Sequence, residues 1–133
     1  LFKSGYIIIT PREGTNSVSL FLLDCCLKTY GKLSKFAPLN SGELVQSIRF
    51  TKTRCYLVTQ NKANPFYVIG LEDPAKPTIL GQHNTTGFSL YLHLYNDETV
   101  LGLGREIIKY NVQSGLKLTM FNVSNANNPT PSA

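Results

Sequence analysis

The segment Arg54–Gly81 holds three strand-like stretches separated by two turns, and this unit constrains the fold more than any other part of the sequence. Aromatic and β-branched residues fill Tyr56–Thr59 and Phe66–Leu71 with the period-two alternation that is typical of β-strands. The polar break Gln60–Pro65 separates them. Glu72–Pro77 ends the second, because its aspartate can hydrogen-bond to the backbone ahead and its prolines fix φ and lack an N–H donor. We expect a hairpin here, followed by a further strand.

Strand-length patterns of the same kind fill the rest of the chain, and no stretch longer than about ten residues has a clean 3.6-residue apolar period. In Phe88–Tyr95, alternation predicts that Ser89, Tyr91, His93 and Tyr95 share one face. For Leu27–Phe36 a helix is the minor alternative. We therefore expect an all-β protein, with further strands in Leu1–Thr10, Ser17–Asp24, Leu27–Phe36, Leu44–Phe50, Phe88–Tyr95, Thr99–Leu103, Ile107–Val112 and Gly115–Ser124.

An internal repeat indicates which kind of all-β fold the chain adopts. Tyr67–Pro77 recurs in altered form at Thr119–Pro129, 52 positions along the chain, and Ser19–Lys28 is a weaker copy upstream. Repeats of about 40 to 50 residues built from four short strands indicate β-propeller blades, and one blade cannot bury both of its faces alone. Nearly three blades fit into the chain, whereas closed propellers have about four or more.

We predict an all-β, partial β-propeller of about three four-stranded antiparallel blades, with a β-sandwich as the less favoured alternative. The predicted propeller segment covers residues 1–126, with blade repeats about 47 to 52 residues apart, and residues 127–133 form a polar tail or linker.

The same residues resemble a known family, the secreted bacterial and archaeal proteins grouped by a "beta propeller domain". Two positions depart from the family pattern: Asn125-Ala126 replaces an aspartate-proline pair, and Leu94 replaces a proline. The resemblance implies an exported protein and implies no catalytic residues. The segments that carry it are Ser47–Phe50, Arg54–Thr59, Pro65–Gly81, Gly87–His93, Leu101–Glu106 and Gly115–Pro129.

Charge and hydropathy argue against a nucleic-acid-binding surface and against a membrane-spanning helix. The net charge of +5 comes from 13 basic and 8 acidic residues that are spread along the chain, whereas a nucleic-acid surface concentrates basic residues among stacking aromatics. No run reaches the ~18 apolar residues of a membrane-spanning helix. The chain begins at Leu1, so we expect a processed or partial chain.

The cysteines leave two interpretations open. Cys25, Cys26 and Cys55 do not have the spacing of metal ligands. Cys55 is either a small buried hydrophobic residue or the disulfide partner of Cys25 or Cys26, which requires an oxidising compartment. Cys25 and Cys26 point to opposite faces if they lie on a strand, so only one of them can face Cys55.

No residue pattern predicts a catalytic, cofactor or metal site. His93 with Asp97 and Glu98 lacks the ligand spacing of a metal centre, and no serine lies in a nucleophile elbow. Asn84 and Asn122 each begin an asparagine-x-serine/threonine triplet, which is an N-glycosylation site only in an exported eukaryotic chain.

Two functions are compatible with these sequence features. The first is a secreted or cell-surface, non-enzymatic module, structural or protein-binding, that is completed by other protein chains or by further blades of the same protein. The alternative is a ligand-binding or enzymatic propeller with a pocket at its central channel. Convergence of five side chains on one opening would favour the alternative, and their dispersal the first: Arg49, Arg54, Arg105, His93 and Asp97.

Overall fold

The computed structural model describes residues 4–9, 19–24, 44–60, 65–73, 77–108 and 112–132, and every regular element in these ranges is a β-strand. The all-β prediction is therefore confirmed. The strands are β1 (Ser4–Ile9), β2 (Ser19–Asp24), β3 (Leu44–Phe50), β4 (Arg54–Gln60), β5 (Pro65–Gly70), β6 (Thr78–Asn84), β7 (Gly87–Asn96), β8 (Thr99–Ile108), β9 (Val112–Asn122) and β10 (Thr130–Ser132).

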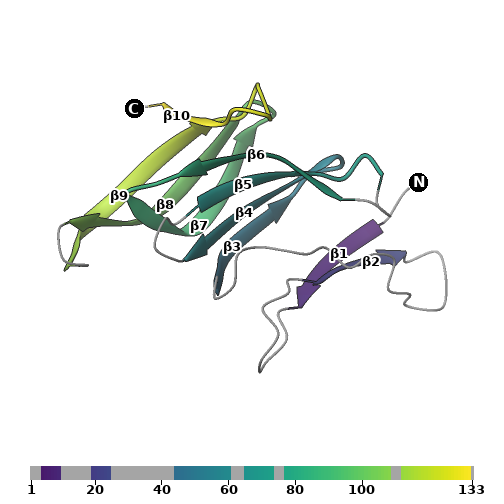
Figure 1. Ribbon diagram of the computed structural model, residues 1–133, viewed down its shortest axis with the longest axis horizontal. Helices are drawn as coiled ribbons and strands as arrows, with labels where there is room; N and C mark the ends of the chain where they lie inside the picture. The colour runs from purple at the N-terminus through teal and green to yellow at the C-terminus, as the bar shows by residue number, and fades with distance from the viewer. Residues whose placement is uncertain are drawn as a thin grey trace.

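The strands form three antiparallel sheets that follow one another across the molecule in chain order (Figure 1). β1 and β2 form a two-stranded sheet, with Ile7 opposite Phe21. The strand predicted in Leu27–Phe36 lies outside the described residues. The described part of the chain thus contains two four-stranded sheets and one pair, and the prediction of three blades stays a prediction.

The first four-stranded sheet, called sheet A here, has the order β3-β4-β5-β6, so that each strand pairs with the next one in sequence. Its register places Tyr56 opposite Arg49 and Leu57 opposite Tyr67. All six residues of β5 are buried. Aromatic and β-branched side chains suit a strand that is covered on both faces, which explains the near-continuous apolar run of this segment.

The second four-stranded sheet, called sheet B, has the order β7-β8-β9-β10 and differs from the prediction at two places. Ile107–Val112 is not a separate strand: Ile108 is the last residue of β8 and pairs with Val112, the first residue of β9. In addition, Thr130–Ser132 pairs with β9, although its polar composition placed it in a tail. Backbone hydrogen bonding does not depend on side-chain polarity, so a polar edge strand gives no apolar signal.

A β-bulge in β7 changes which side chains share a face. The register with β8 shifts between Ser89 and Tyr91, which leaves Leu90 as the extra residue. Ser89 is consequently buried, whereas Leu90 is 50% exposed. The prediction that Ser89 and Tyr91 share a face is wrong for this reason, because one inserted residue inverts the alternation.

Sheets A and B stack on each other, with β3 running beside β7. The Ser47 hydroxyl accepts a hydrogen bond of 3.1 Å from the backbone N–H of Leu92, and the Arg49 guanidinium lies 4.7 Å from the ring centroid of Tyr91. Between the sheets lies the inter-sheet core, whose buried members are Tyr56, Val58, Phe66, Val68, Leu92, Val100, Phe121 and Val123.

The other face of sheet A has a second buried cluster, formed by Cys55, Leu57, Tyr67, Ile69 and Leu71. Both faces of sheet A are therefore covered.

Two hydrogen bonds occupy equivalent positions in sheets A and B. The N–H of Leu71 donates to the carbonyl of Thr53 over 2.8 Å, and the N–H of Val123 donates to the carbonyl of Glu98, also over 2.8 Å. In both sheets, the residue beyond the third strand is thus tied to the turn between the first and second strands. Leu71 and Val123 are the positions that the 52-residue alignment pairs.

Candidate ligand pocket between the two sheets

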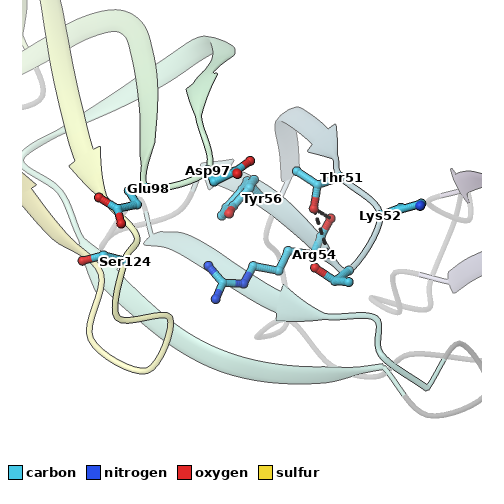
Figure 2. A pocket seen from close by; sticks show the side chains of 8 residues that line it. Thr51, Lys52, Arg54, Tyr56, Asp97, Glu98 and Ser124 are labelled. Carbon is cyan, nitrogen blue, oxygen red and sulfur yellow. Dashed lines mark hydrogen bonds between the residues drawn. The ribbon is translucent and has the colours of Figure 1, made fainter.

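A pocket of about 480 Å³ opens where two turns, one from each sheet, lie beside the segment that follows β9 (Figure 2). Ligand-binding pockets in proteins commonly have volumes of about 300 to 1,000 Å³. The lining combines charged groups of both signs with hydroxyl groups. Its residues are Thr51, Lys52, Thr53, Arg54, Tyr56, Asp97, Glu98 and Ser124.

The wall contributed by sheet A is the turn between β3 and β4. The N–H of Thr51 donates to the carbonyl of Arg54 over 2.8 Å, and the Thr51 hydroxyl accepts a hydrogen bond of 3.0 Å from the N–H of Arg54. The turn is therefore closed from both directions. This closure presents Lys52 at the tip and places Arg54 at the start of β4, facing sheet B (Figure 2).

The wall contributed by sheet B is the two-residue turn Asp97-Glu98, which joins β7 to β8. The side-chain oxygen of Asn96 accepts a hydrogen bond of 2.9 Å from the N–H of Glu98, an arrangement that is common in asparagine-initiated turns. Beside it, the side-chain oxygen of Asn122 accepts hydrogen bonds from the N–H and the hydroxyl of Ser124, over 3.0 and 2.6 Å. Asparagine side chains thus hold both segments of this wall.

Arg54 connects the two walls. Its Nη1 donates a hydrogen bond of 2.9 Å to the carbonyl of Val123 in the segment after β9. A guanidinium has five N–H donors, so this one bond leaves most of its donor capacity for other groups. Within the described ranges, neither Arg54 nor Lys52 lies within ion-pairing distance of Asp97 or Glu98. Opposite charges therefore line one pocket without neutralising each other directly.

Tyr56 is the most buried of the residues that line the pocket. The residue is 2% exposed, its ring belongs to the inter-sheet core, and its ring centroid lies 6.1 Å from that of Phe66. No hydrogen bond of its hydroxyl to another described residue is present. With respect to the described residues, the hydroxyl therefore keeps its capacity to donate and accept hydrogen bonds, which a molecule that enters the pocket can use.

Of the five residues whose convergence would favour a ligand-binding function, Arg54 and Asp97 line the pocket. Arg49 instead stacks on Tyr91. His93 and Arg105 are exposed on β7 and β8, where their strand partners are Leu101 and Phe88. The five residues therefore do not converge on one opening.

Sequence reasoning missed the part that the other six residues play in lining the pocket, among them Lys52, Tyr56, Glu98 and Ser124. A signal for two of them lies in the predicted order of strands and turns. Lys52-Thr53 and Asp97-Glu98 are each predicted as the connection between two successive strands, although the 52-residue alignment itself pairs Lys52 with Gly104. Equivalent turns of stacked units lie at the same edge, so these charged residues could have been expected side by side.

The remaining predicted sites are separate from the pocket. Cys55 is buried in β4 and forms no disulfide with another described residue, and burial raises the pKa of its thiol. Cys25 and Cys26 lie outside the described residues, so a disulfide to either stays a prediction. Asn84 at the end of β6 and Asn122 at the end of β9 are exposed, and their glycosylation likewise stays a prediction.

The described residues contain neither a metal-binding cluster nor a helix that could span a membrane. Among them, no group of three or more histidine, cysteine or acidic side chains is arranged to hold a metal ion. In the same ranges, no helix has the length and apolar character needed to cross a membrane.

With two stacked four-stranded sheets in place, comparison with known proteins identifies the family. The model of the beta propeller domain matches residues 5–133. The chain belongs to the beta propeller domain family. No solved structure matches it significantly.

Two curated archaeal relatives match this beta propeller domain chain over most of its length. An uncharacterized protein of Archaeoglobus fulgidus is 32% identical over 126 residues, and an uncharacterized protein of Methanocaldococcus jannaschii is 33% identical over 134 residues. Each alignment covers 95% of the chain but only 19% and 20% of the relative, respectively. The chain thus spans about a fifth of the length of these relatives.

Proposed function

We propose that this chain is a segment of a larger, exported β-propeller and acts as a non-enzymatic structural or protein-interaction module. The observation that carries the proposal is the outer face of sheet B, meaning the face turned away from sheet A. It exposes large apolar side chains at the positions that sheet A uses to bind its neighbour.

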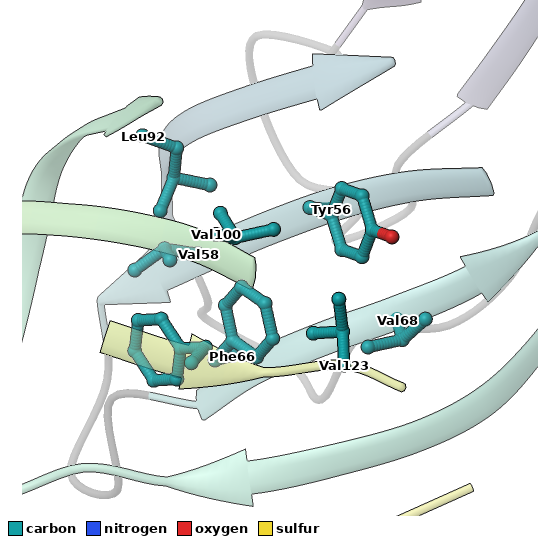
Figure 3. Close-up of a cluster of buried hydrophobic side chains, with 8 residues drawn as sticks. Tyr56, Val58, Phe66, Val68, Leu92, Val100 and Val123 are labelled. Atoms are coloured by element: carbon teal, nitrogen blue, oxygen red, sulfur yellow. The ribbon is translucent and has the colours of Figure 1, made fainter. Parts of the chain in front are cut away.

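The correspondence between the two sheets follows from their hydrogen bonds. Leu71 and Val123 are equivalent, and the turns that they bind end at Thr53 and Glu98. Counting along the strands from these anchors pairs the four sheet A members of the inter-sheet core with four residues of sheet B. Tyr56, Val58, Phe66 and Val68 (Figure 3) correspond to Leu101, Leu103, Leu118 and Met120.

The exposure of these counterparts is the second part of the argument. Leu103, Leu118 and Met120 are 43%, 65% and 37% exposed, and the register places Leu103 opposite Leu118 and Leu101 opposite Met120. They form one continuous apolar surface across two neighbouring strands. Such surfaces mark interaction sites, because apolar area that stays in water contributes nothing to stability.

We expect a further four-stranded sheet to cover this surface, in the way that sheet B covers sheet A.

Export and the lack of a catalytic role are supported by the family resemblance, and the dispersal of Arg49, His93 and Arg105 also favours a non-enzymatic module. Fractionation of source cells should find the protein outside the cytoplasm, and recovery from the cytoplasm alone would contradict export.

Lysine substitution in the full-length protein tests whether the outer face of sheet B is covered. Leu118→Lys should lower the free energy of unfolding by about 3 kcal/mol or more, because it buries an unpaired charge. The matched control is Leu116→Lys, on the same strand, where the alignment pairs the 82% exposed Leu116 with the polar Asn64 of the first unit. The control should change stability by no more than about 0.5 kcal/mol. Equal small effects of both variants would contradict the proposal.

A further inference from the structure

We infer that the pocket between the two sheets binds a small zwitterion, a free amino acid or short peptide that carries both a carboxylate and an ammonium group. This goes beyond the proposed structural role and is independent of it, because both walls of the pocket belong to this chain. If the proposed role in a larger propeller proved wrong, this site would remain.

The first argument is the distribution of charge. Asp97 and Glu98 lie on the sheet B wall, and Arg54 reaches across from sheet A (Figure 2). Figure 2 also shows Lys52 directed away from Arg54. No direct ion pair joins Arg54 to either carboxylate in the described ranges. A ligand with one group of each sign would satisfy both walls at once, whereas a simple anion would face two carboxylates and a simple cation would face Arg54.

The second argument is the hydroxyl of Tyr56. Tyr56 is buried, lines the pocket together with Arg54, and its hydroxyl has no hydrogen-bond partner among the described residues. A phenolic hydroxyl and a guanidinium both donate hydrogen bonds to a carboxylate, and the planar guanidinium can do so through two parallel N–H groups. The carboxylate of the ligand is therefore assigned to Arg54 and Tyr56.

The ammonium group is assigned to the turn of sheet B. The carboxylates of Asp97 and Glu98 make no hydrogen bond to other described residues, and the turn backbone is held by Asn96 rather than by these carboxylates. An ammonium has three donors and no acceptor, so two carboxylates and the hydroxyl of Ser124 match its requirements. The pocket volume of about 480 Å³ leaves room for a peptide larger than a single amino acid.

Binding of L-alanyl-L-alanine, followed by NMR of the backbone amides, tests this assignment. The free dipeptide should cause saturable shifts at both turns, while its N-acetyl and C-terminal amide derivatives should each bind at least about tenfold more weakly, because each lacks one charge. L-Alanine as a second probe distinguishes a single amino acid from a peptide as the preferred ligand. The inference would be overturned if neither the dipeptide nor L-alanine caused saturable shifts, or if the free and capped dipeptides bound equally well.

Variants of the pocket sharpen the test. Glu98→Gln should weaken binding of the free dipeptide about tenfold but should not weaken binding of the N-acetyl form, which has no ammonium group and is repelled by the carboxylate. The matched control is Glu72→Gln, which changes another exposed glutamate in a turn outside the pocket and should bind like the unaltered protein. Tyr56→Phe should weaken binding several-fold without lowering the melting temperature, since the hydroxyl has no described partner to lose. Equal affinities of Glu98→Gln and Glu72→Gln would overturn the inference.

Discussion

Sheets A and B have the same strand order and the same anchoring hydrogen bonds, but they differ in how many of their faces are covered. Sheet A has one buried cluster toward sheet B and a second on its opposite face. Sheet B buries only Leu92, Val100, Phe121 and Val123 among its described large apolar residues, all toward sheet A, and exposes Leu103 and Leu118 on its other face. Equivalent sheets thus reach different burial through their neighbours, which is the behaviour of a stacked repeat.

The difference also appears in the residue types. The core-facing positions of sheet A are aromatic and β-branched, with Tyr56, Val58, Phe66 and Val68 packed against sheet B. Their counterparts in sheet B are leucines and a methionine. Both sets are apolar, so sequence pattern alone does not tell which of the two faces is covered.

The largest effect is expected where the two sheets meet. Phe121→Ala should lower the free energy of unfolding by about 3 to 5 kcal/mol, because it leaves a cavity in the inter-sheet core. Phe121 is fully buried, and the centroid of its ring lies 4.0 Å from that of Phe66, with 2° between the ring planes. Urea unfolding measures the change.

The control for this prediction is Leu118→Ala on the outer face of sheet B, measured in the 133-residue chain. Leu118 is 65% exposed, so its truncation should cost less than about 0.5 kcal/mol. Similar losses from Phe121→Ala and Leu118→Ala would contradict the difference between the two faces.

A smaller effect, which depends on pH, is expected from the second face of sheet A. Burial raises the pKa of the Cys55 thiol, so the folded protein keeps this thiol protonated while the unfolded chain ionises above its ordinary pKa of about 8.5. The stabilisation is complete below about pH 8.5 and is lost as the pH rises further, at up to about 1.4 kcal/mol per pH unit.

Urea unfolding at pH 7 and pH 10 measures this dependence. The matched variant is Cys55→Ala, in which Cys25 and Cys26 remain, so that the difference between the two proteins isolates Cys55. The unaltered protein should lose more stability than Cys55→Ala between these pH values. An identical decline in both would contradict a buried, protonated thiol at Cys55.

The smallest effect concerns the contact between β3 and β7. The Arg49 guanidinium lies 4.7 Å from the ring centroid of Tyr91, which is 48% exposed, so the cation–π interaction should contribute about 0.5 to 1 kcal/mol. A double-mutant cycle with Arg49→Gln and Tyr91→Ala measures the coupling energy. Additive effects of the two changes would show that the sheets are joined by the apolar core without this contact.

Much of the fold was predictable because strand formation and repetition are local properties of the sequence. The end of β5 ahead of Glu72 and the short connection at Lys52-Thr53 were correctly placed, since prolines and tight turns leave a local signature. The bulge at Leu90 and the strand Thr130–Ser132 were missed. Both depend on pairing with a partner strand, which the residues themselves do not specify.

Part of the pocket was within reach of sequence reasoning. Arg54 and Asp97 were named as candidates, and the turns beside them were predicted, although the 52-residue alignment does not pair these turns. The roles of Tyr56 and Ser124 were not foreseen, because Tyr56 reads as an ordinary strand residue and Ser124 as the end of a strand. Their positions depend on how sheets A and B stack.

The all-β class, the strand-turn unit and the 52-residue repeat can all be read from the amino-acid sequence, because alternation, turn chemistry and repetition act over short distances along the chain. Which apolar faces are buried, and where charges of opposite sign meet, depends instead on the tertiary arrangement. Burial is set by what lies opposite a face, and in this molecule the surfaces that cover each other come from different repeats.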